Sequence, residues 1–323
     1  MKKLRAVLAV FAFYLLSFLP ASAHVKWFVE SEEVTEKYHG LFPFYTIESK
    51  EVWIWSLLLI VWVILFAFLD KLLGEPVKLK TFAEKHSNVV NRVAQAVLGL
   101  FLVTVSFVWK IIIIPEIDVE TMPMVVLSVV QALVGAMFIF NFRPRLASLL
   151  LIGFCIGVGF IASWVAFLEN IILLSLGVYF LIRHSKPTDV TYRLKDHALS
   201  IVRIGTGISL IVLAFTEKLA YPELSLMFLT QHQWNFFAPI FPWFTNSLFV
   251  LSAGFVEIGF GILFIMGYLT RITTLMIAAF FACSVTTMLI QTGKWEVEDL
   301  VVYAAAILLV FFGAGVTYFT KKD

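Results

Sequence analysis

Charged residues are scarce in this sequence. Asp, Glu, Lys and Arg make up only 14% of the 323 residues, about half of their share in soluble domains, which excludes a water-soluble globule. The 24 basic and 22 acidic residues nearly cancel, so the chain lacks the basic surface of a nucleic-acid-binding protein. Cysteine occurs twice, which is too few for a disulfide scaffold, and neither cysteine has metal-site spacing.

Apolar residues dominate instead. They account for 61% of the chain, and phenylalanine alone occurs 33 times, a composition typical of a polytopic membrane protein. Read with a window of about 19 residues, the sequence predicts an all-α integral membrane fold. Its lipid-spanning helices are nine in number and lie near 52–69, 89–109, 124–142, 146–163, 165–182, 199–217, 247–269, 272–291 and 299–318.

The first residues have the pattern of an export signal. Three basic residues precede an apolar stretch, 6–19, that is too short for a comfortable membrane span. Pro20 ends this stretch, and residues 21–23, Ala-Ser-Ala, form a cleavage site. An uncleaved signal anchor is the alternative. We therefore expect a signal peptide at 1–23, a periplasmic segment at 24–51 and a single transmembrane helix at 52–73.

The distribution of charge predicts the orientation. If the mature N-terminus lies outside and nine spans follow, most Lys and Arg residues fall on one side, among them Arg143, Arg145 and Arg271. Most acidic residues fall on the other side. Because cytoplasmic loops carry the excess of basic residues, we expect a bacterial-type inner (cytoplasmic) membrane protein. Its mature N-terminus would be periplasmic and its C-terminus cytoplasmic.

Two motifs recur along the chain. The first consists of a polar residue, a glycine four positions later and a lysine at the helix end, at an offset of 108: Gln95, Gly99 and Lys110, then Arg203, Gly207 and Lys218. The second has a constant offset of 126: Gln131, Gly135 and Arg145, then Glu257, Gly261 and Arg271. We expect two tandem four-helix units, 89–183 and 199–318, in the same orientation, as in parallel transporter repeats. The change of offset indicates an insertion at 219–246.

The second unit resembles a DoxX-type membrane domain. The resemblance rests on a first helix with Arg, Gly and an outer Lys, and on a second helix with Glu, Gly and a terminal Gly-x-x-x-Arg: Arg203, Gly207, Lys218, Glu257, Gly261, Gly267 and Arg271. The first unit matches less closely, since Gln95 and Gln131 replace Arg and Glu. The resemblance implies four-helix bundles. It also implies a link to redox complexes, because some members of the family are small subunits of thiosulfate:quinone oxidoreductase.

Glu257 is the main candidate site residue. It lies near the middle of the seventh predicted span, where a charged acid facing lipid costs at least ~2.5 kcal/mol. We therefore expect it to face the bundle, with Arg203 or Lys218 of the preceding span as its charge partner. The functional hypothesis is a site for a proton or a quinone headgroup. The alternative is a buried pair that only holds the helices together.

The outer end of the sixth span offers two further hypotheses. Glu217 and Lys218 are expected to form a snorkelling pair at the membrane surface. In the following insertion, His232 and Trp234 are candidates for a lid over an apolar ring. The alternative for these aromatic residues is an interfacial belt.

Histidines suggest a metal site. After signal cleavage, His24 would offer its amine and a ring nitrogen to one ion, and imidazole suits Cu(II). His39 and His232 are the other outward-facing histidines, so the three form a candidate copper site. The alternative is that His24 is first in the mature chain by accident.

Three functions therefore remain open. The first is a membrane subunit of a redox, respiratory or sulfur-oxidising system that binds a quinone, with Glu257, Lys218, Arg203 and Trp234 as ligand-binding residues. The second is a periplasm-facing copper-binding protein. The third is a small-molecule transporter, suggested by the parallel repeat.

Overall fold

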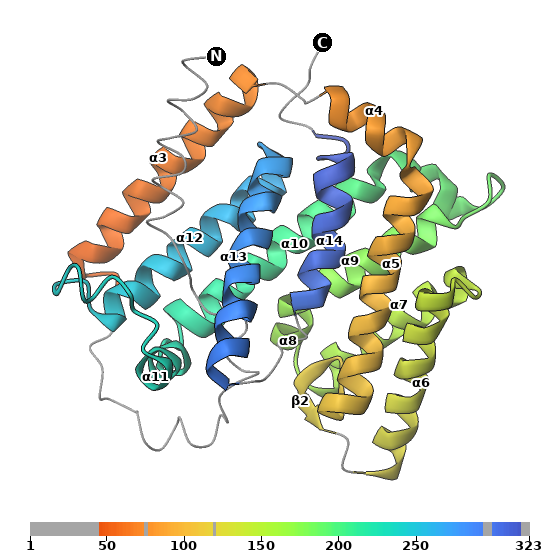
Figure 1. Cartoon of the computed structure of the whole chain (residues 1–323), viewed down its shortest axis with the longest axis horizontal. Coiled ribbons are helices and arrows are strands. Elements are labelled where there is room, and N and C mark those ends of the chain that lie inside the picture. The colour runs from red at the N-terminus through yellow and green to blue at the C-terminus, as the bar shows by residue number, and fades with distance from the viewer. Residues whose placement is uncertain (1–44, 74–76, 119–120, 293–298, 318–323) are drawn as a thin grey trace.

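The computed structural model describes residues 45–73, 77–118, 121–292 and 299–317 of the chain. Helices make up most of the described chain (Figure 1), as the apolar sequence predicts. The predicted signal peptide, 1–23, and most of the predicted periplasmic segment, 24–51, lie outside the described residues.

Two groups of helices follow an initial pair. The initial pair is α3 (Lys50–Leu73) and α4 (Val77–Lys85). The first group is α5 (Ser87–Thr104), α6 (Met122–Phe140), α7 (Pro144–Ile161), α8 (Trp164–Glu169) and α9 (Ile171–Arg183). The second group follows the 3₁₀ helix η3 (Val190–His197) and is α10 (Ala198–Ala214), α11 (Glu223–His232), α12 (Asn246–Met266), α13 (Thr270–Thr292) and α14 (Asp299–Phe312).

A short β-hairpin interrupts the otherwise helical fold. Strands β1 (Ile111–Ile112) and β2 (Ile114–Asp118) pair in antiparallel fashion directly after the first helix of the first group. Residues 111–114 are consecutive isoleucines, and β-branched side chains favour extended backbone. All four are buried in the main hydrophobic core, so the hairpin closes one end of that core.

Among the described residues, six helices are long and apolar enough to cross a membrane. They are Lys50–Leu73, Ser87–Val108, Met122–Phe140, Pro144–Ile161, Val190–Leu219 and Asn246–Met266. The other three predicted spans fall on shorter apolar helical stretches: α9 (Ile171–Arg183), the Thr270–Cys283 part of α13, and α14 (Asp299–Phe312). The fifth predicted span is interrupted, because α8 ends at Glu169 and α9 begins at Ile171.

Matching helix ends occur in the two groups. The π-helical turns η2 (Val105–Trp109) and η4 (Phe215–Leu219) extend α5 and α10. Asn141 ends α6 and Gly267 ends α12, both with left-handed backbone, the conformation that Gly and Asn adopt most readily after a helix.

The two groups form one body with a shared core. Helix α9 packs against α10, and α14 packs against α5, so the last helix of each group contacts the first helix of the other. Residues from both groups, including Phe101, Phe180 and Leu308, belong to one hydrophobic cluster.

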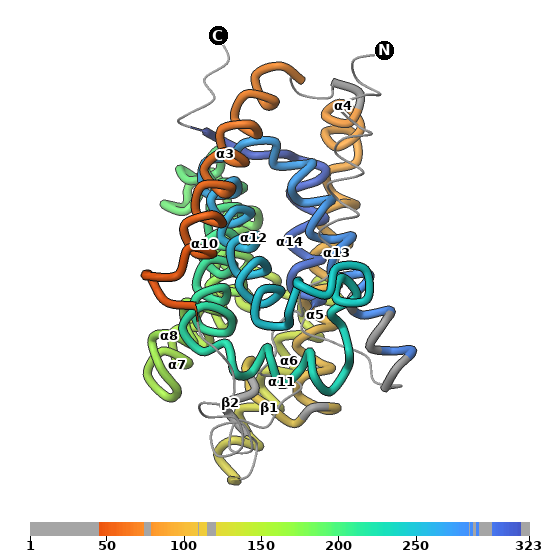
Figure 2. Tube along the Cα trace, turned by 90° about the vertical axis from the view of Figure 1, so that its left-hand side faces the viewer, coloured from red at the N-terminus to blue at the C-terminus, as the bar shows by residue number. Residues whose placement is uncertain are grey.

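Helix α3 lies on the flank of this body beside α12 (Figures 1 and 2). Only Trp62, Phe66 and Leu69 of α3 are buried, and they contact residues of α12 and α13. Most of its other apolar side chains are exposed, as expected for a helix that faces lipid on one side.

Candidate functional site

The candidate site lies where α10 crosses α12. Gly207 and Gly261 meet at the crossing, and a Cβ atom on Gly207 would lie 2.6 Å from the carbonyl oxygen of Gly261. Further along α12, a Cβ atom on Gly254 would lie 3.3 Å from the Cβ atom of Lys218. Because small residues allow helix backbones to approach closely, these glycines bring η4 against the middle of α12.

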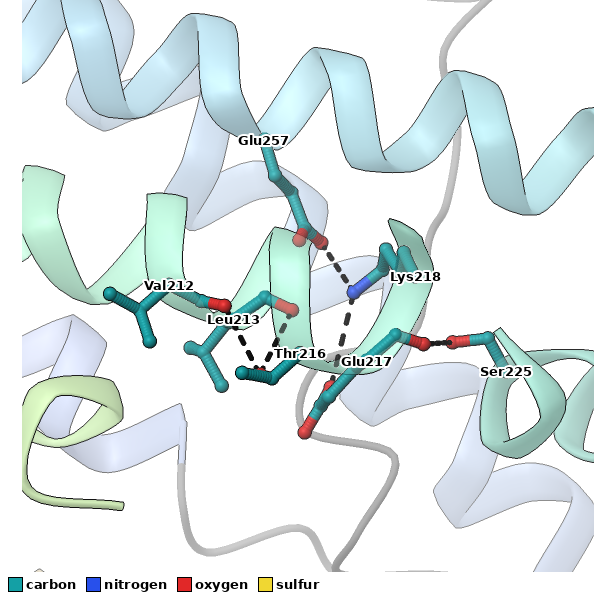
Figure 3. A network of polar contacts seen from close by, with 7 residues as sticks. All are labelled: Val212, Leu213, Thr216, Glu217, Lys218, Ser225 and Glu257. Atoms are coloured by element: carbon teal, nitrogen blue, oxygen red, sulfur yellow. Dashed lines mark hydrogen bonds and ion pairs between the residues drawn. The ribbon is translucent and has the colours of Figure 1, made fainter. Parts of the chain in front are cut away.

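Lys218 and Glu257 form a buried ion pair at this contact. The Lys218 Nζ atom lies 2.9 Å from Glu257 Oε1 (Figure 3), and the two side chains are 3% and 14% exposed. Charges taken out of water need such a partner, since an unpaired buried charge is very costly. Of the two bases that the sequence offered to Glu257, the structure therefore pairs Lys218 with it.

Glu217 is also part of the site, and its predicted role as a surface snorkelling residue is wrong. Its side chain is fully buried, and its Oε2 atom lies 4.0 Å from Lys218 Nζ. Helix α11 covers this end of α10, where the Ser225 hydroxyl donates a hydrogen bond of 2.8 Å to the Glu217 carbonyl oxygen. The insertion thus removes both charges from the surface, which the residue order alone could not indicate.

One carboxylate oxygen of Glu257 is available to a ligand. In the described part of the chain, Oε2 is buried and has no hydrogen-bond partner. Leaving a buried acceptor unsatisfied costs about 1–3 kcal/mol, so a proton, a water molecule or a ligand is needed there. The site therefore presents an ammonium donor and a carboxylate oxygen without a hydrogen-bond partner next to each other.

The structure does not bring Arg203 to this site. Arg203 lies 15 positions before Lys218 on the same helix, which is about 22 Å at 1.5 Å per residue. Its guanidinium donates to the carbonyl oxygens of Phe264 and Ile265 at the end of α12, and to Ala314 at 3.0 Å. A cation at a helix C-terminus satisfies orphan carbonyls and complements the helix dipole, so Arg203 stabilises the opposite end of the bundle.

The first group has an uncharged arrangement at the corresponding place. A Cβ atom on Gly99 would lie 2.5 Å from the carbonyl oxygen of Gly135, so α5 and α6 cross as closely as α10 and α12 do. The buried Gln131 amide donates to the Ser106 hydroxyl at 2.9 Å, and Lys110 is exposed. A neutral amide needs no counter-ion, which explains why Lys110 is not drawn inwards.

Trp234 belongs to a small hydrophobic cluster formed by α11 and the first turns of α12. It is 4% exposed and packs edge-on against Phe228, with ring centroids 5.1 Å apart. His232 stacks beside the same ring, and burial lowers the pKa of its imidazole below the usual value. By contrast, Trp243 is 67% exposed, as the interfacial belt hypothesis expects of an aromatic residue.

The copper hypothesis gains no support from the described residues. His24 and His39 lie outside them, and within them no group of three or more His, Cys, Asp or Glu side chains could hold a metal ion. Within that part of the chain, His232 is therefore not in a group of side chains that could bind a metal ion.

Comparisons with known proteins identify no relative of this chain. No protein-family model, no curated protein and no solved structure matches the chain.

Proposed function

We propose that this chain is an inner-membrane subunit of a redox or respiratory system, such as sulfur oxidation, and that its Lys218–Glu257 pair binds a quinone headgroup. The observation that carries the proposal is the buried ion pair of 2.9 Å with an unpartnered Glu257 Oε2 atom beside it, judged over the described chain. A quinone has carbonyl oxygens that accept hydrogen bonds, and a quinol has hydroxyls that donate them. Lys218 supplies the donor for the first, and Glu257 supplies the acceptor for the second.

Access from the bilayer supports a lipid-soluble ligand. The Glu257 side chain is 14% exposed, and Phe215 on the adjoining η4 turn is 50% exposed. Apolar helices surround the pair, so an apolar ring can approach from lipid while its polar atoms meet Lys218 and Glu257. Hydrogen bonds to charged groups are among the stronger ones.

A duplicated four-helix unit with DoxX-like character is part of the same proposal. The close glycine crossings and the left-handed helix ends recur in both groups at offsets of 108 or 126, and the π-helical turns recur at an offset of 110. The reciprocal contacts of α9 with α10 and of α14 with α5 are those expected of two copies related by an axis along the membrane normal. Only the second copy carries the charged pair.

The proposed topology places the pair on the periplasmic side. It counts the three shorter apolar helices as spans, which gives nine in total with a periplasmic mature N-terminus and a cytoplasmic C-terminus. Lys218 then lies toward the periplasmic end of α10.

Titration of purified protein in lipid nanodiscs with short-chain benzoquinone and naphthoquinone analogues tests the proposal. We expect Lys218→Met and Glu257→Gln each to raise the dissociation constant by about 10-fold or more, since a hydrogen bond to a charged group contributes about 1.5–3 kcal/mol.

Lys110→Met is the matched control, because Lys110 is the corresponding residue of the first group and is exposed. It should leave the dissociation constant unchanged. The proposal fails if the unsubstituted protein binds neither analogue, or if both site variants bind as tightly as the Lys110→Met control.

Transport is a second candidate, favoured by the reciprocal contact of the two helix groups. Parallel repeats in transporters bind their substrates at the repeat interface. Uptake of a labelled panel of organic acids, amino acids and sugars into proteoliposomes tests it, and no uptake of any member would reject it.

A further inference from the structure

A small cavity lies between the two helix groups, and its lining does not include the Lys218–Glu257 pair. Its water-accessible volume is about 30 Å³, and side chains of α5, α9, α10, α13 and α14 line it, together with Asn170. A water molecule needs about 10–15 Å³ of such space. The cavity therefore has room for about two water molecules.

Three polar residues, Asn170, Thr206 and Ser209, are part of the lining. The Thr206 hydroxyl donates to the Val202 carbonyl oxygen at 2.8 Å, and the Ser209 hydroxyl donates to the carbonyl oxygen of Glu169. Both hydroxyls have thus used their only proton and offer oxygen lone pairs to a guest. Asn170 Nδ2 donates to Ala166 at 3.0 Å, which leaves the Asn170 side-chain oxygen as a third acceptor.

The guest should be neutral. No charged side chain lines the cavity, and most of its wall is apolar, including Phe101, Leu210 and Ile277. An ion in such surroundings would lose its hydration without gaining a counter-charge. A water molecule instead needs only two to four polar partners, which the three oxygens provide.

The corresponding face of α5 is apolar. The positions 108 residues before Thr206 and Ser209 are Leu98 and Phe101, which are 0% and 1% exposed. Ser209 is much smaller than Phe101, so the space that an aromatic ring fills in the first group is open in the second. Only α10 therefore has the polar face that hydration requires.

This face of α10 continues to the acidic residue of the candidate site. Thr206, Ser209, Leu213 and Glu217 follow one another at spacings of three or four residues, which places them on one side of a helix. Figure 3 shows the side chains of Leu213 and Glu217 on the side of α10 that points away from α12. Leu213 lines the cavity and is one turn from Glu217.

We propose that this cavity is a buried water site, and that its two water molecules extend the polar face of α10 inwards from Glu217. The water donates to the oxygens of Thr206, Ser209 and Asn170. Leu213 separates it from the carboxyl group of Glu217 by a single side chain. The site does not depend on quinone binding.

Thiol reactivity tests the proposal, because silver ions react with a thiolate that forms only in contact with water. In full-length protein with Cys155→Ala and Cys283→Ser, we expect Thr206→Cys and Leu213→Cys to react at least ~10-fold faster than their matched controls. The controls are Leu98→Cys and Val105→Cys, the corresponding positions of α5. Equal rates within both pairs would overturn the proposal.

A second measurement needs no substitution. A cryo-EM map of the unmodified protein, at a resolution that resolves ordered water, should show density within hydrogen-bonding distance of Ser209 Oγ and Thr206 Oγ1. An empty cavity that takes up xenon under pressure would be dry and apolar, and would equally overturn the proposal. Neither readout involves a quinone, so failure of the proposed quinone site leaves this test intact.

Discussion

The backbones of Gly207 and Gly261 touch, so closely that a Cβ atom on Gly207 would lie 2.6 Å from the carbonyl oxygen of Gly261. That oxygen belongs to the backbone of α12 and cannot turn away as a flexible side chain could. The contact fixes the distance between α10 and α12. The position of Lys218 against Glu257 therefore depends on these glycines.

Gly207→Ala should destabilise the protein. The added methyl group must push the two helices apart, and overpacking of this kind costs about 1–3 kcal/mol. A lower melting temperature of the purified protein in detergent would show the effect.

Gly153→Ala and Gly157→Ala are the matched controls, because a Cβ atom at either position would meet nothing within 4 Å. Both should keep or slightly raise the melting temperature, since alanine favours helix more than glycine does. If Gly207→Ala has the same melting temperature as these controls, the close crossing does not determine stability.

Removing Lys218 alone should destabilise the protein more than removing both Lys218 and Glu257. Lys218→Met leaves Glu257 as a buried charge without its partner, which typically costs about 3–5 kcal/mol. Adding Glu257→Gln removes that charge and should restore most of the lost melting temperature. If the single and the double variants melt at the same temperature, the pair is not coupled.

Much of the fold could be predicted because lipid imposes a simple rule on the sequence. Spanning helices must be apolar over about 20 residues, so the spans that became α3, α6 and α12 were visible in the composition alone. The recurring Gly99 and Gly207 were visible for a related reason: a close helix contact tolerates few other residues. Burial of Glu257 followed from the cost of exposing an acid to lipid.

Features set by contacts between distant segments could not be predicted. Glu217 and Lys218 read as surface residues because they end a span, and only the fold of α11 over them makes them buried. Arg203 and Lys218 were equal candidates for Glu257 until helix geometry separated them. Spacing along one helix does not say which end meets the middle of another.

Arg203→Leu should destabilise the end of the bundle opposite to Lys218. It would leave the carbonyl oxygens of Phe264, Ile265 and Ala314 without their donor, and each hydrogen bond to a charged group contributes about 1.5–3 kcal/mol. Arg203→Gln should lose less, because Gln95 already fills this role in the first group by donating to Phe138 at 3.1 Å. Equal melting temperatures for the two variants would contradict this.

Acidification should lower the stability of the protein, and His184 should contribute to this loss. Burial, together with the nearby Arg183 and Arg92, lowers the pKa of this imidazole below its usual value of 6.5. The unfolded chain therefore takes up the proton first, and stability falls as the pH drops through about 6.5 toward the lowered pKa. Above that range both states are neutral at His184 and the effect vanishes.

Thermal melting between pH 8 and pH 5 measures this effect. His184→Gln keeps a donor for the Gln95 side-chain oxygen, which lies 3.2 Å from His184 Nε2, but cannot titrate. We expect a flatter pH profile for the variant than for the parent. Parallel profiles would show that His184 is not responsible.

Gly259→Leu should detach α3 from the rest of the protein. The indole ring of Trp62 occupies the place where a Cβ atom on Gly259 would lie, and Leu59 lies 3.0 Å from that place.

A disulfide crosslink can report whether α3 is docked. Near the C-terminal end of α3, the Asp70 side chain accepts a hydrogen bond of 2.9 Å from the Leu269 backbone N–H, which gives the positions for the crosslink. Cysteines at 70 and 269, in protein with Cys283→Ser, should form a disulfide while α3 is docked, because this hydrogen bond shows that the two residues are in contact and a disulfide needs two neighbouring residues. We expect the yield of this crosslink to fall sharply when Gly259→Leu is added and to persist with Gly153→Ala. An unchanged yield with Gly259→Leu would mean that α3 is held by something other than the contact between Trp62 and Gly259.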